Sequence, residues 1–456
     1  MRWMVTTVVL SLWIASLASA ATHRVGPGQM YRHPGHVPWD NLSPGDVVEI
    51  HWRPEPYRFK WAISRRGTAE QPIVVRGLRN EKGELPILDA GRAATPATQN
   101  FWSEARGVIK IGGSDSSGDT APAWIVVENL DISSARPGQF FLGKSGLTEY
   151  AQNASAIYLE SGEHITIRNC RLHDSGNGLF VAPAAREILV EGCDIYDNGI
   201  EDSIYEHNVY SEAAGMVYQF NRFGPLRTGC RGNNLKDRSA GLVVRYNRIE
   251  GGNRELDLVD SQEGTEIRND PRYHLGLVYG NLLIEPAGVD NNQIIHWGGD
   301  SGDPTANRRQ LRLLNNTVIS TRTGTTVLLK LTTNQQTAEV RNNVLFTSGA
   351  GSSFAILDEE GQVQMSANYL KPGWKKCHGT LAGEILASGN IESPDPGFVN
   401  FMTGDFRPAA TSALRNATVP LSGDPFEILF EPPTPKTPGV KRVPNGPLDL
   451  GCFEGL

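Results

Sequence analysis

The sequence has too few cysteines, too little positive charge and too few long apolar runs to fit several classes of protein. Five cysteines in 456 residues are too few for a disulfide scaffold, and they lack the spacing of a metal site. The formal net charge of −7 disfavours binding along a nucleic-acid backbone, which requires a basic face. After residue 20, no run is apolar enough to cross a membrane. The sequence therefore predicts neither a nucleic-acid-binding nor a membrane-embedded protein.

The first 20 residues have the composition of a secretion signal. Arg2 provides a positive start, residues 5–17 are apolar, and residues 18–20 are the small residues that a signal peptidase requires. The apolar run is too short to span a bilayer comfortably. We therefore expect a mature protein that begins at Ala21, is secreted or periplasmic, and has no membrane anchor.

Short β-branched segments recur along the interior, and each contains an Asn or Gly turn. Apolar and polar residues alternate in these segments, which predicts strands, and no helical stretch of useful length separates them. They start roughly 23 to 40 residues apart, a spacing typical of solenoid repeats. The segments are residues 124–132, 164–172, 187–195, 215–223, 241–249, 276–284, 310–319 and 338–346. Stacked coils of this kind would form parallel sheets without crossover helices.

Two residue types support the stacking of coils. Asn recurs after the strands, where it tolerates left-handed backbone and can form hydrogen bonds along a bend. Cys170 and Cys193 lie 23 residues apart in similar contexts, so they would occupy one position in adjacent coils. We favour a small apolar ladder over a disulfide for this pair, because free cysteine packs well as a small hydrophobic residue.

The repeats predict four parts of the chain. Residues 1–20 form the signal peptide, and residues 21–110 form an N-terminal cap and the first coils. A parallel β-solenoid follows over residues 111–400, and residues 401–456 form a C-terminal capping segment with an extended, Pro-rich strap. A solenoid needs such atypical end pieces to cover its core.

The two ends of the mature chain resemble one family of secreted enzymes. The opening contains Pro-Gly-Asp at residues 44–46, Tyr57, and Arg-Gly-Thr-Ala-Glu-Gln-Pro-Ile at residues 66–73. The chain closes with Asp-Leu-Gly-Cys-Phe-Glu at residues 449–454. These motifs are similar to those of β-helical polysaccharide lyases of the alginate lyase and chondroitinase B type. The resemblance implies an all-β fold, a right-handed parallel β-helix, and elimination chemistry on a uronic-acid-containing polysaccharide.

Candidate catalytic residues lie in the densest polar stretch, from Glu206 to Asp260. It contains His207, Asn208, Tyr210, Glu212, Arg227, Arg231, Asn233, Asn234, Lys236, Asp237, Arg238, Arg245, Arg254, Asp257 and Asp260. Uronate elimination requires a base for the proton next to the carboxylate, and cations or a metal to stabilise the enediolate. A lysine can be that base when positive charge or burial favours its neutral form. Lys236 has several arginines close to it in sequence, which favours this role.

The family resemblance points to the same lysine. Residues 233–239, Asn-Asn-Leu-Lys-Asp-Arg-Ser, are similar to the family segment that carries the catalytic lysine, which here is Lys236. Residues 245–249 are similar to the next family element. The third element departs, because residues 255–261 are Glu-Leu-Asp-Leu-Val-Asp-Ser where an Arg-His pair is expected. The resemblance therefore implies the base but not an assisting arginine.

The remaining candidates each have a structural alternative. We expect catalytic roles for Arg238, His207 and Tyr210, since histidine and tyrosine can both transfer protons. The alternative for Arg238 is a purely structural ion pair, and the alternative for His207 is a cap on backbone groups. Substrate contacts are predicted for Arg231, Asn234, Arg245, Arg254, His296 and Trp297, with Trp297 stacking on a sugar face and a structural role as the alternative for His296.

A calcium ion is a further expectation from the resemblance. Asp257 and Asp260 are the predicted ligands, since carboxylates bind Ca²⁺ and uronates prefer a bridging cation. A spacing of three residues places them on opposite faces of a strand, so they meet only if the strand ends after Leu258. No segment matches a defined calcium motif.

Two other classes of function remain open. A glycoside hydrolase or a uronan epimerase could use the same fold, and Glu255, Asp257, Asp260 and Asp300 are available as carboxylates. A non-catalytic glycan-binding protein would need only a groove with aromatic residues. In each case the predicted partner is a polysaccharide, anionic for the lyase, and we expect a monomer.

Overall fold

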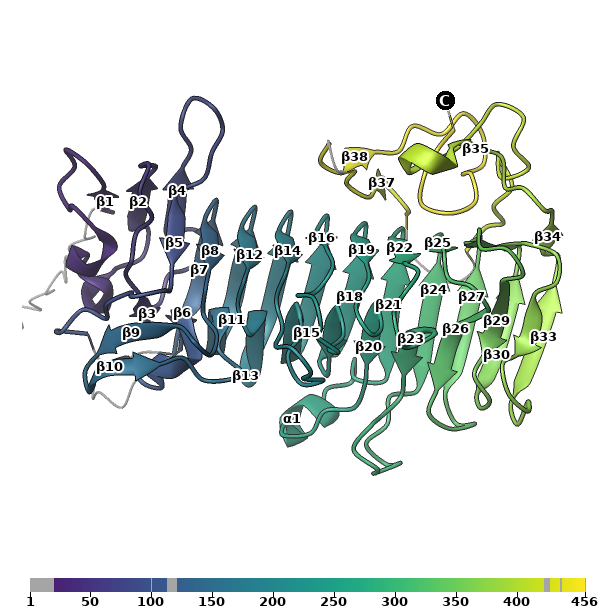
Figure 1. Cartoon of the computed structure of the whole chain (residues 1–456), viewed down its shortest axis with the longest axis horizontal. Coiled ribbons are helices and arrows are strands. Elements are labelled where there is room, and N and C mark those ends of the chain that lie inside the picture. Colours follow the sequence, from purple (N-terminus) through teal and green to yellow (C-terminus); the bar gives the residue numbers. More distant parts are fainter. Residues whose placement is uncertain (1–19, 100, 113–120, 422–426, 435–436, 456) are drawn as a thin grey trace, which may run out of the picture.

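Almost all the regular structure of the chain is β-strand, stacked into an elongated solenoid (Figure 1). A computed structural model describes residues 20–99, 101–112, 121–421, 427–434 and 437–455. The signal peptide predicted over residues 1–20 lies outside the described residues, except for Ala20. Within the described ranges, no helix has the length and apolar character needed to span a bilayer.

The coils of the solenoid form three faces, each a run of parallel strands. The long strands β11 (Ser155–Arg168), β13 (Asn177–Glu191) and β15 (Val209–Gln219) bend from the first face onto the second. The first face also contains β3 (Trp61–Ile63), β6 (Gly107–Ile111), β17 (Leu235–Asp237), β20 (Leu256–Leu258), β23 (Gln293–Trp297), β26 (Thr325–Leu331), β29 (Ser353–Leu357) and β32 (Lys375–Cys377).

The second face completes the same 21-stranded sheet, and the third face is a separate 11-stranded sheet. The second face adds β1 (Thr22–Val25), β2 (Val47–His51), β4 (Ile73–Leu78), β7 (Ala123–Glu128), β18 (Ala240–Arg245), β21 (Leu275–Tyr279), β24 (Gln310–Leu314), β27 (Thr337–Arg341), β30 (Gln362–Ser366) and β33 (Glu384–Ser388). The third face consists of β5 (Ile87–Asp89), β8 (Asp131–Ser133), β12 (Arg171–His173), β14 (Asp194–Tyr196), β16 (Arg222–Phe223), β19 (Arg248–Glu250), β22 (Leu282–Glu285), β25 (Thr317–Ser320), β28 (Val344–Thr347), β31 (Tyr369–Leu370) and β34 (Ile391–Glu392).

Few elements lie outside these faces. They are the hairpin of β9 (Phe140–Gly143) and β10 (Gly146–Glu149), the pair β35 (Phe398–Asn400) and β36 (Asp405–Pro408), the pair β37 (Phe430–Glu431) and β38 (Val440–Lys441), the helix α1 (Thr265–Arg268), and the 3₁₀ turns at Pro34–His36, Trp39–Asn41, Glu104–Arg106 and Phe401–Thr403. The short helix α1 projects from the lower side of the solenoid in Figure 1.

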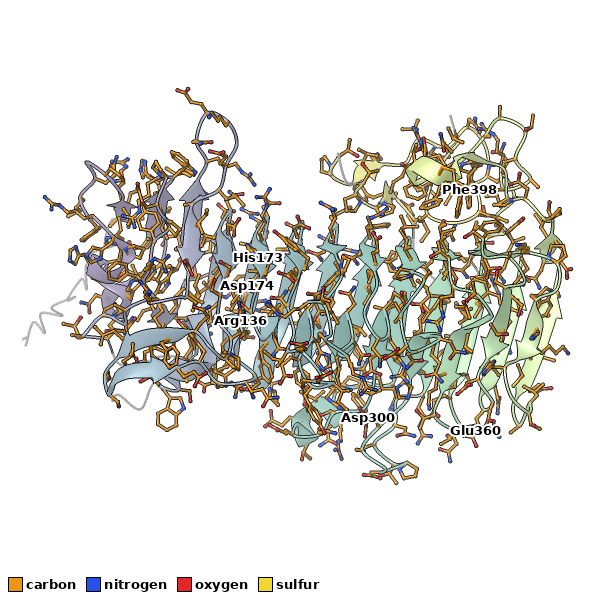
Figure 2. The ribbon with its side chains drawn as sticks, viewed as in Figure 1. Arg136, His173, Asp174, Asp300, Glu360 and Phe398 are labelled. Atoms are coloured by element: carbon orange, nitrogen blue, oxygen red, sulfur yellow. The ribbon has the colours of Figure 1, made fainter. Side chains whose placement is uncertain are left out.

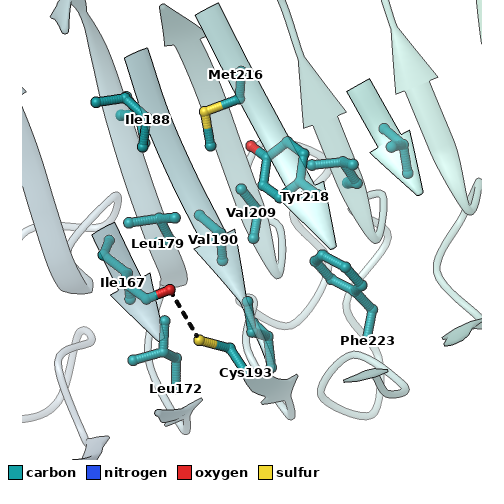
Figure 3. Close-up of a cluster of buried hydrophobic side chains, with 14 of the residues drawn as sticks. Ile167, Leu172, Leu179, Ile188, Val190, Cys193, Val209, Met216, Tyr218 and Phe223 are labelled. Atoms are coloured by element: carbon teal, nitrogen blue, oxygen red, sulfur yellow. Dashed lines mark hydrogen bonds between the residues drawn. The ribbon is translucent and has the colours of Figure 1, made fainter. Parts of the chain in front are cut away.

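Side chains from all three faces meet in one continuous core. Strand alternation buries every second residue, as in the pattern of β4, where buried and partly exposed residues alternate. Because the strands pair in register, apolar side chains of one coil stack on apolar side chains of the next. Ile165 of β11 pairs with Ile188 of β13, which pairs with Met216 of β15. Figure 3 shows such side chains converging, with Leu179 from the first face and Leu172 from the third.

The cysteine ladder predicted from the repeats is present. All five cysteines are free, and Cys170 and Cys193 are each 1% exposed. The thiol of Cys193 lies 3.6 Å from the carbonyl oxygen of Ile167, as drawn in Figure 3. The two residues therefore pack as small apolar groups, as expected.

A buried asparagine ladder fixes the turn between the second and third faces. Its members are Asn221, Asn247, Asn281, Asn316, Asn343, Asn368 and Asn390. Each amide from Asn221 to Asn368 donates to the side-chain oxygen of the next member at 2.9–3.0 Å. The expected hydrogen bonding is thus present. Left-handed asparagines also occur after strands, at Asn129, Asn169, Asn315 and Asn342, but each ladder member itself follows a left-handed residue, for example Tyr246 (φ 56°).

An Asn281→Ala variant should lose about 3 kcal/mol of unfolding free energy, since it leaves several buried polar groups without partners. The Asn281 amide donates to the carbonyl of Val244 and to Asn316, and its oxygen accepts the backbone N–H of Asn247 at 2.9 Å. Urea denaturation measures the loss. The control is Asn390→Ala at the end of the ladder, which should cost about 1 kcal/mol. Equal losses in both variants would contradict the prediction.

The two ends of the chain cover the solenoid differently. At the N-terminal end, Trp39 stacks on Trp61 with ring centroids 4.7 Å apart, and both are buried. The described residues after Asn400 instead fold back along the outside of the solenoid (Figure 1), where Ile428 packs on Tyr246 and Phe406 packs beside Ile319. This segment therefore covers the side of the coils rather than their last edge, which β32, β33 and β34 form.

Candidate functional site

Four polar side chains from successive coils form one row on the first face. Tyr210 of β15 pairs in register with Lys236 of β17, Lys236 pairs with Asp257 of β20, and Asp257 pairs with His296 of β23. Each step along the row is one strand spacing, about 4.8 Å. Inward neighbours such as Leu235 are buried, so the alternation of the strands directs this row outward.

A groove of about 560 Å³ lies over this row. Its lining combines the row with loops from neighbouring coils: Ile204, Tyr205, His207, Tyr210, Arg231, Asn233, Lys236, Arg238, Asn253, Arg254, Asp257, Gln262, His296 and Asp300. Figure 2 shows Asp300 near the loops on the lower side of the solenoid. Nearly all of these lining residues have polar or charged side chains, which suits an extended hydrophilic ligand.

Lys236 lies between two carboxylates at the centre of the groove. Its Nζ donates to Oδ2 of Asp257 at 2.6 Å and to Oδ2 of Asp300 at 2.8 Å. The lysine side chain is 12% exposed. The sequence predicted positive charge around Lys236. This prediction is wrong for its direct partners, which are the carboxylates of Asp257 and Asp300.

Asp257 connects Lys236 to His296. Its carboxylate accepts hydrogen bonds from Asn233 Nδ2 at 2.8 Å and lies 2.9 Å from His296 Nδ1. Burial opposes ionisation of Asp257, but the hydrogen bond of His296 and the charge of Lys236 hold its pKa well below the usual range. Burial lowers the pKa of His296, so the imidazole is neutral at pH 7.

Arg238 is paired with Asp300 through two hydrogen bonds. Its Nη1 and Nη2 lie 2.8 and 3.0 Å from the two carboxylate oxygens, and the guanidinium side chain is only 3% exposed. Burial raises the pKa of Asp300, yet the hydrogen bonds from Arg238 and the charge of Lys236 lower it overall. Arg238 thus orients Asp300 toward Lys236.

His207 and Tyr210 add two neutral groups to the groove. The Nδ1 of His207 accepts the backbone N–H of Asn233 at 2.9 Å, so a neutral ring carries its hydrogen on Nε2. Burial, with the charge of Lys236, lowers the pKa of His207 to about 3. Burial raises the pKa of Tyr210 to about 12, although Arg238 opposes the shift. At neutral pH both side chains are therefore hydrogen-bond donors.

A family model described as a right handed beta helix region matches residues 109–271. The chain folds as a right-handed parallel β-helix. Pectate lyase Pel9A has this fold too, with a TM-score of 0.54 over 97% of this chain and 98% of that protein at 13% identity. The fold that the sequence motifs implied is confirmed.

Two further solved structures are less similar. Alginate lyase from Paenibacillus sp. str. FPU-7 gives a TM-score of 0.46 at 11% identity, over 71% of this chain and 92% of that protein. The GH136 lacto-N-biosidase from Eubacterium ramulus gives 0.43 at 12% identity, over 82% and 68%. A sequence comparison with curated proteins finds no match. At sequence identities this low, similarity of structure indicates the fold and not the activity.

Three side chains for which substrate contacts were predicted lie away from the groove. Trp297 is 0% exposed in the core, so its predicted stacking on a sugar is wrong. Asn234 is also 0% exposed, and its amide donates to the carbonyls of Glu250 and Gly251. Arg245 lies on the second face, where it donates to Gln219 and Tyr279. None of these three side chains lines the groove. The contacts predicted for the buried Trp297 and Asn234 are wrong, and that of Arg245 stays a prediction.

Asp257 and Asp260 do not form a calcium site. Strand β20 ends at Leu258, but Asp260 accepts the backbone N–H of Asp300 at 2.8 Å and binds Ser301, whereas Asp257 binds Lys236 and His296. Their oxygens thus have other partners. In the part of the chain that the structure describes, no group of His, Cys, Asp and Glu side chains converges to hold a metal. The proposed ligand pair is wrong, and a calcium requirement stays a prediction.

Several residues that line the groove were not predicted from the sequence. Asp300 was considered only as a hydrolytic carboxylate, although it contacts both Lys236 and Arg238. Tyr205 and Ile204 form one wall and are 73% and 49% exposed. Arg231 and Arg254 do line the groove, as expected.

A pair of buried glutamates, Glu255 and Glu285, lies in direct contact inside the β-helix. Glu255 and Glu285 are both 0% exposed, and Glu285 Oε1 lies 3.2 Å from Arg322 Nη1. Burial raises the pKa of Glu285 to about 7, and burial together with repulsion from Glu285 raises that of Glu255. The β-helix therefore holds protons here that an unfolded chain would release.

This pair predicts a pH-dependent stability difference between the wild type and Glu285→Gln. The pKa of Glu285 in the folded state lies above the unfolded value of 4.5. The stabilisation that comes from its bound proton is therefore fully present below pH 4.5 and is lost as the pH rises to about 7. Over this window the wild type should lose on the order of 2 kcal/mol relative to the variant. Urea denaturation at several pH values measures the difference, with Glu70→Gln as an exposed control. A difference that does not change with pH would contradict it.

Proposed function

We propose that this β-helix protein is a polysaccharide lyase that cleaves a uronic-acid-containing polymer by β-elimination. The observation that carries the proposal is the placement of Lys236 beside a phenol, Tyr210, in a groove whose other cations are Arg231, Arg238 and Arg254. The predicted signal peptide supports action outside the cytoplasm. The name of pectate lyase Pel9A supports lyase chemistry on this fold.

The groove residues can be assigned to the steps of elimination. Arg231 and Arg254 bind the uronate carboxylate, and the Nε2–H of His207 donates to the charge that develops on it. The neutral amine of Lys236 takes the proton from the carbon next to the carboxylate, and the carbon–oxygen bond to the leaving sugar breaks. Tyr210 gives its proton to the leaving oxygen. The products are an unsaturated uronate and a free hydroxyl end.

The ion pairs of Lys236 set a condition for this chemistry. In the free groove the ammonium donates to Asp257 and Asp300, so it must release a proton before it can accept one. Only the amine that has released this proton can act as the base.

A glycoside hydrolase is less well supported by the groove. Asp257 and Asp300 lie close together, since one oxygen of each is within 2.8 Å of Lys236 Nζ. Hydrolysis needs one carboxyl group with a raised pKa to protonate the leaving oxygen. The pKa values of both Asp257 and Asp300 are lowered instead, so neither is suited to be that acid.

The test is ultraviolet absorbance during incubation of the mature protein with a panel of uronate-containing polysaccharides, with calcium and with chelator. Elimination produces a conjugated, absorbing product, and we expect a continuous rise with at least one polymer. New reducing ends without absorbance would identify a hydrolase, and solvent deuterium exchange at the uronate without cleavage an epimerase. Binding without any of these changes would identify a glycan-binding protein. Each of these three outcomes would reject the lyase.

A further inference from the structure

Two loops on one side of the groove pack against each other. Residues 199–206 lie between β14 and β15, and residues 225–232 lie between β16 and β17. The backbone N–H of Arg231 donates to the carbonyl oxygen of Ser203 at 2.9 Å. A Cβ at Gly232 would lie 1.7 Å from a carbonyl oxygen of the first loop, so the two loops approach as closely as only glycine allows. The backbones of the two loops are therefore held in fixed positions relative to each other.

The first loop presents an exposed aromatic ring to the groove. Tyr205 is 73% exposed, its neighbour Ile204 is 49% exposed, and both line the groove. In the part of the chain that the structure describes, no other aromatic ring or cation packs on Tyr205. The other tyrosine of the groove, Tyr210, stacks on Phe180 with ring centroids 4.8 Å apart, and Arg238 lies 5.9 Å from its centroid. An exposed apolar surface rimmed by polar groups is typical of a binding site, and here the available ring is Tyr205.

The second loop presents an arginine whose guanidinium is unoccupied. Arg231 is exposed, and among the described residues its side chain has no hydrogen bond or ion pair. The other two arginines of the groove are engaged. Arg238 makes two hydrogen bonds with Asp300, and Arg254 donates twice to Oε1 of Gln293, at 3.2 and 2.6 Å. A carboxylate that enters the groove can therefore reach Arg231 without displacing another side chain.

We propose that Tyr205 and Arg231 together bind one acidic sugar ring, the uronate beside Lys236. The apolar C–H face of this ring packs on the phenol, and the carboxylate of the same ring pairs with the guanidinium. The inference rests on the proposed lyase function and adds Tyr205 as a binding residue.

Both halves of this site suit the task physically. An aromatic ring buries a large apolar area and loses little conformational freedom, and an arginine–carboxylate pair is a strong, charge-assisted hydrogen bond. Because the packed loops set the distance between Tyr205 and Arg231 in advance, little further ordering is needed when the sugar binds.

The first test measures KM and kcat on a polymer that the wild type cleaves. Tyr205→Ala should raise KM about tenfold and leave kcat within about threefold of wild type, because binding is lost while the base remains. Tyr205→Phe keeps the ring and should leave KM within about twofold. The matched control is Phe140→Ala on the β9–β10 hairpin, which removes a ring that is 42% exposed and does not line the groove. It should leave KM unchanged.

The second test asks whether the two residues bind the same ring. Calorimetry measures the dissociation constants of galacturonate, mannuronate and guluronate tetrasaccharides and of their carboxyl-reduced forms. Tyr205→Ala should weaken binding of both forms about tenfold, whereas Arg231→Gln should weaken binding of the acidic form only. In the double variant, the losses for the acidic form should be less than additive, since each residue depends on the other to hold the ring.

The outcomes separate this inference from the lyase proposal. A KM in Tyr205→Ala equal to that of wild type, or a Tyr205→Phe variant as impaired as Tyr205→Ala, would overturn the inference and leave the lyase intact. Additive losses would place the phenol and the guanidinium on different rings and would also overturn it. Binding that depends on both residues without any cleavage would reject the lyase and keep the site. Neither cleavage of any polymer nor binding of any tetrasaccharide would overturn both.

Discussion

A Lys236→Ala variant should fold normally and lose about 1,000-fold in kcat on any polymer that the wild type cleaves, because it lacks the proposed base. Folding should persist, since Asp257 keeps its contacts with His296 and Asn233, and Asp300 keeps Arg238. Initial rates from product absorbance measure the loss, and circular dichroism confirms the fold.

Two further variants separate the role of Lys236 as a base from its charge. Lys236→Arg keeps a positive charge but cannot be deprotonated, so it should be as inactive as the alanine variant if Lys236 is the base. Lys330→Ala is the matched control, because Lys330 pairs with His296 in the same row of the first face but does not line the groove. Substantial activity in Lys236→Arg would assign only an electrostatic role to Lys236, and wild-type activity in Lys236→Ala would remove it from the mechanism.

An Arg308→Met variant should lower the free energy of unfolding by about 4 kcal/mol, because it leaves a buried carboxylate without its cation. Arg308 and Asp237 are both 0% exposed, and Arg308 Nη2 lies 2.8 Å from Asp237 Oδ1. The same nitrogen donates to the backbone carbonyl of Ser239 at 2.8 Å. Asp237 lies between Lys236 and Arg238, so loss of this pair should also disturb the groove. Urea denaturation and the cleavage rate measure the two effects.

The neighbouring Arg309 provides the control for this prediction. Its guanidinium makes a solvent-exposed contact with Gln335, so Arg309→Met should change stability by less than about 0.5 kcal/mol. The double variant Arg308→Met, Asp237→Leu removes both charges and should recover much of the stability lost in the single variant. A single variant as stable as wild type would show that the buried pair contributes nothing, and would contradict the prediction.

The fold could be predicted from the sequence because each coil repeats the same local sequence pattern. Strand alternation and a recurring asparagine act within a few residues, and stacking copies them from coil to coil. The asparagine ladder shows the limit of local reasoning. Its hydrogen bonds were expected, but the left-handed residue is the one before, as at Tyr246 and Asn247, because the ladder amide must point inward.

The site was predicted only in part because sequence distance is a poor guide to position in a solenoid. Arg245 is nine residues after Lys236 but lies on another face, whereas Asp300 is 64 residues away and contacts it. Trp297 follows His296 directly and therefore points the opposite way, into the core. The sequence could not show which member of each neighbouring pair faces the groove, since that depends on the register between coils.

The fold-back of the described residues after Asn400 has a consequence for the order in which the molecule folds. Ile428, Phe406 and Phe453 cover apolar side chains of coils that were synthesised more than a hundred residues earlier, such as Tyr246 and Ile284. Until the end of the chain has emerged, those coils expose an apolar surface to any neighbouring chain. The segment that is synthesised later is therefore the one that protects the earlier coils from aggregation.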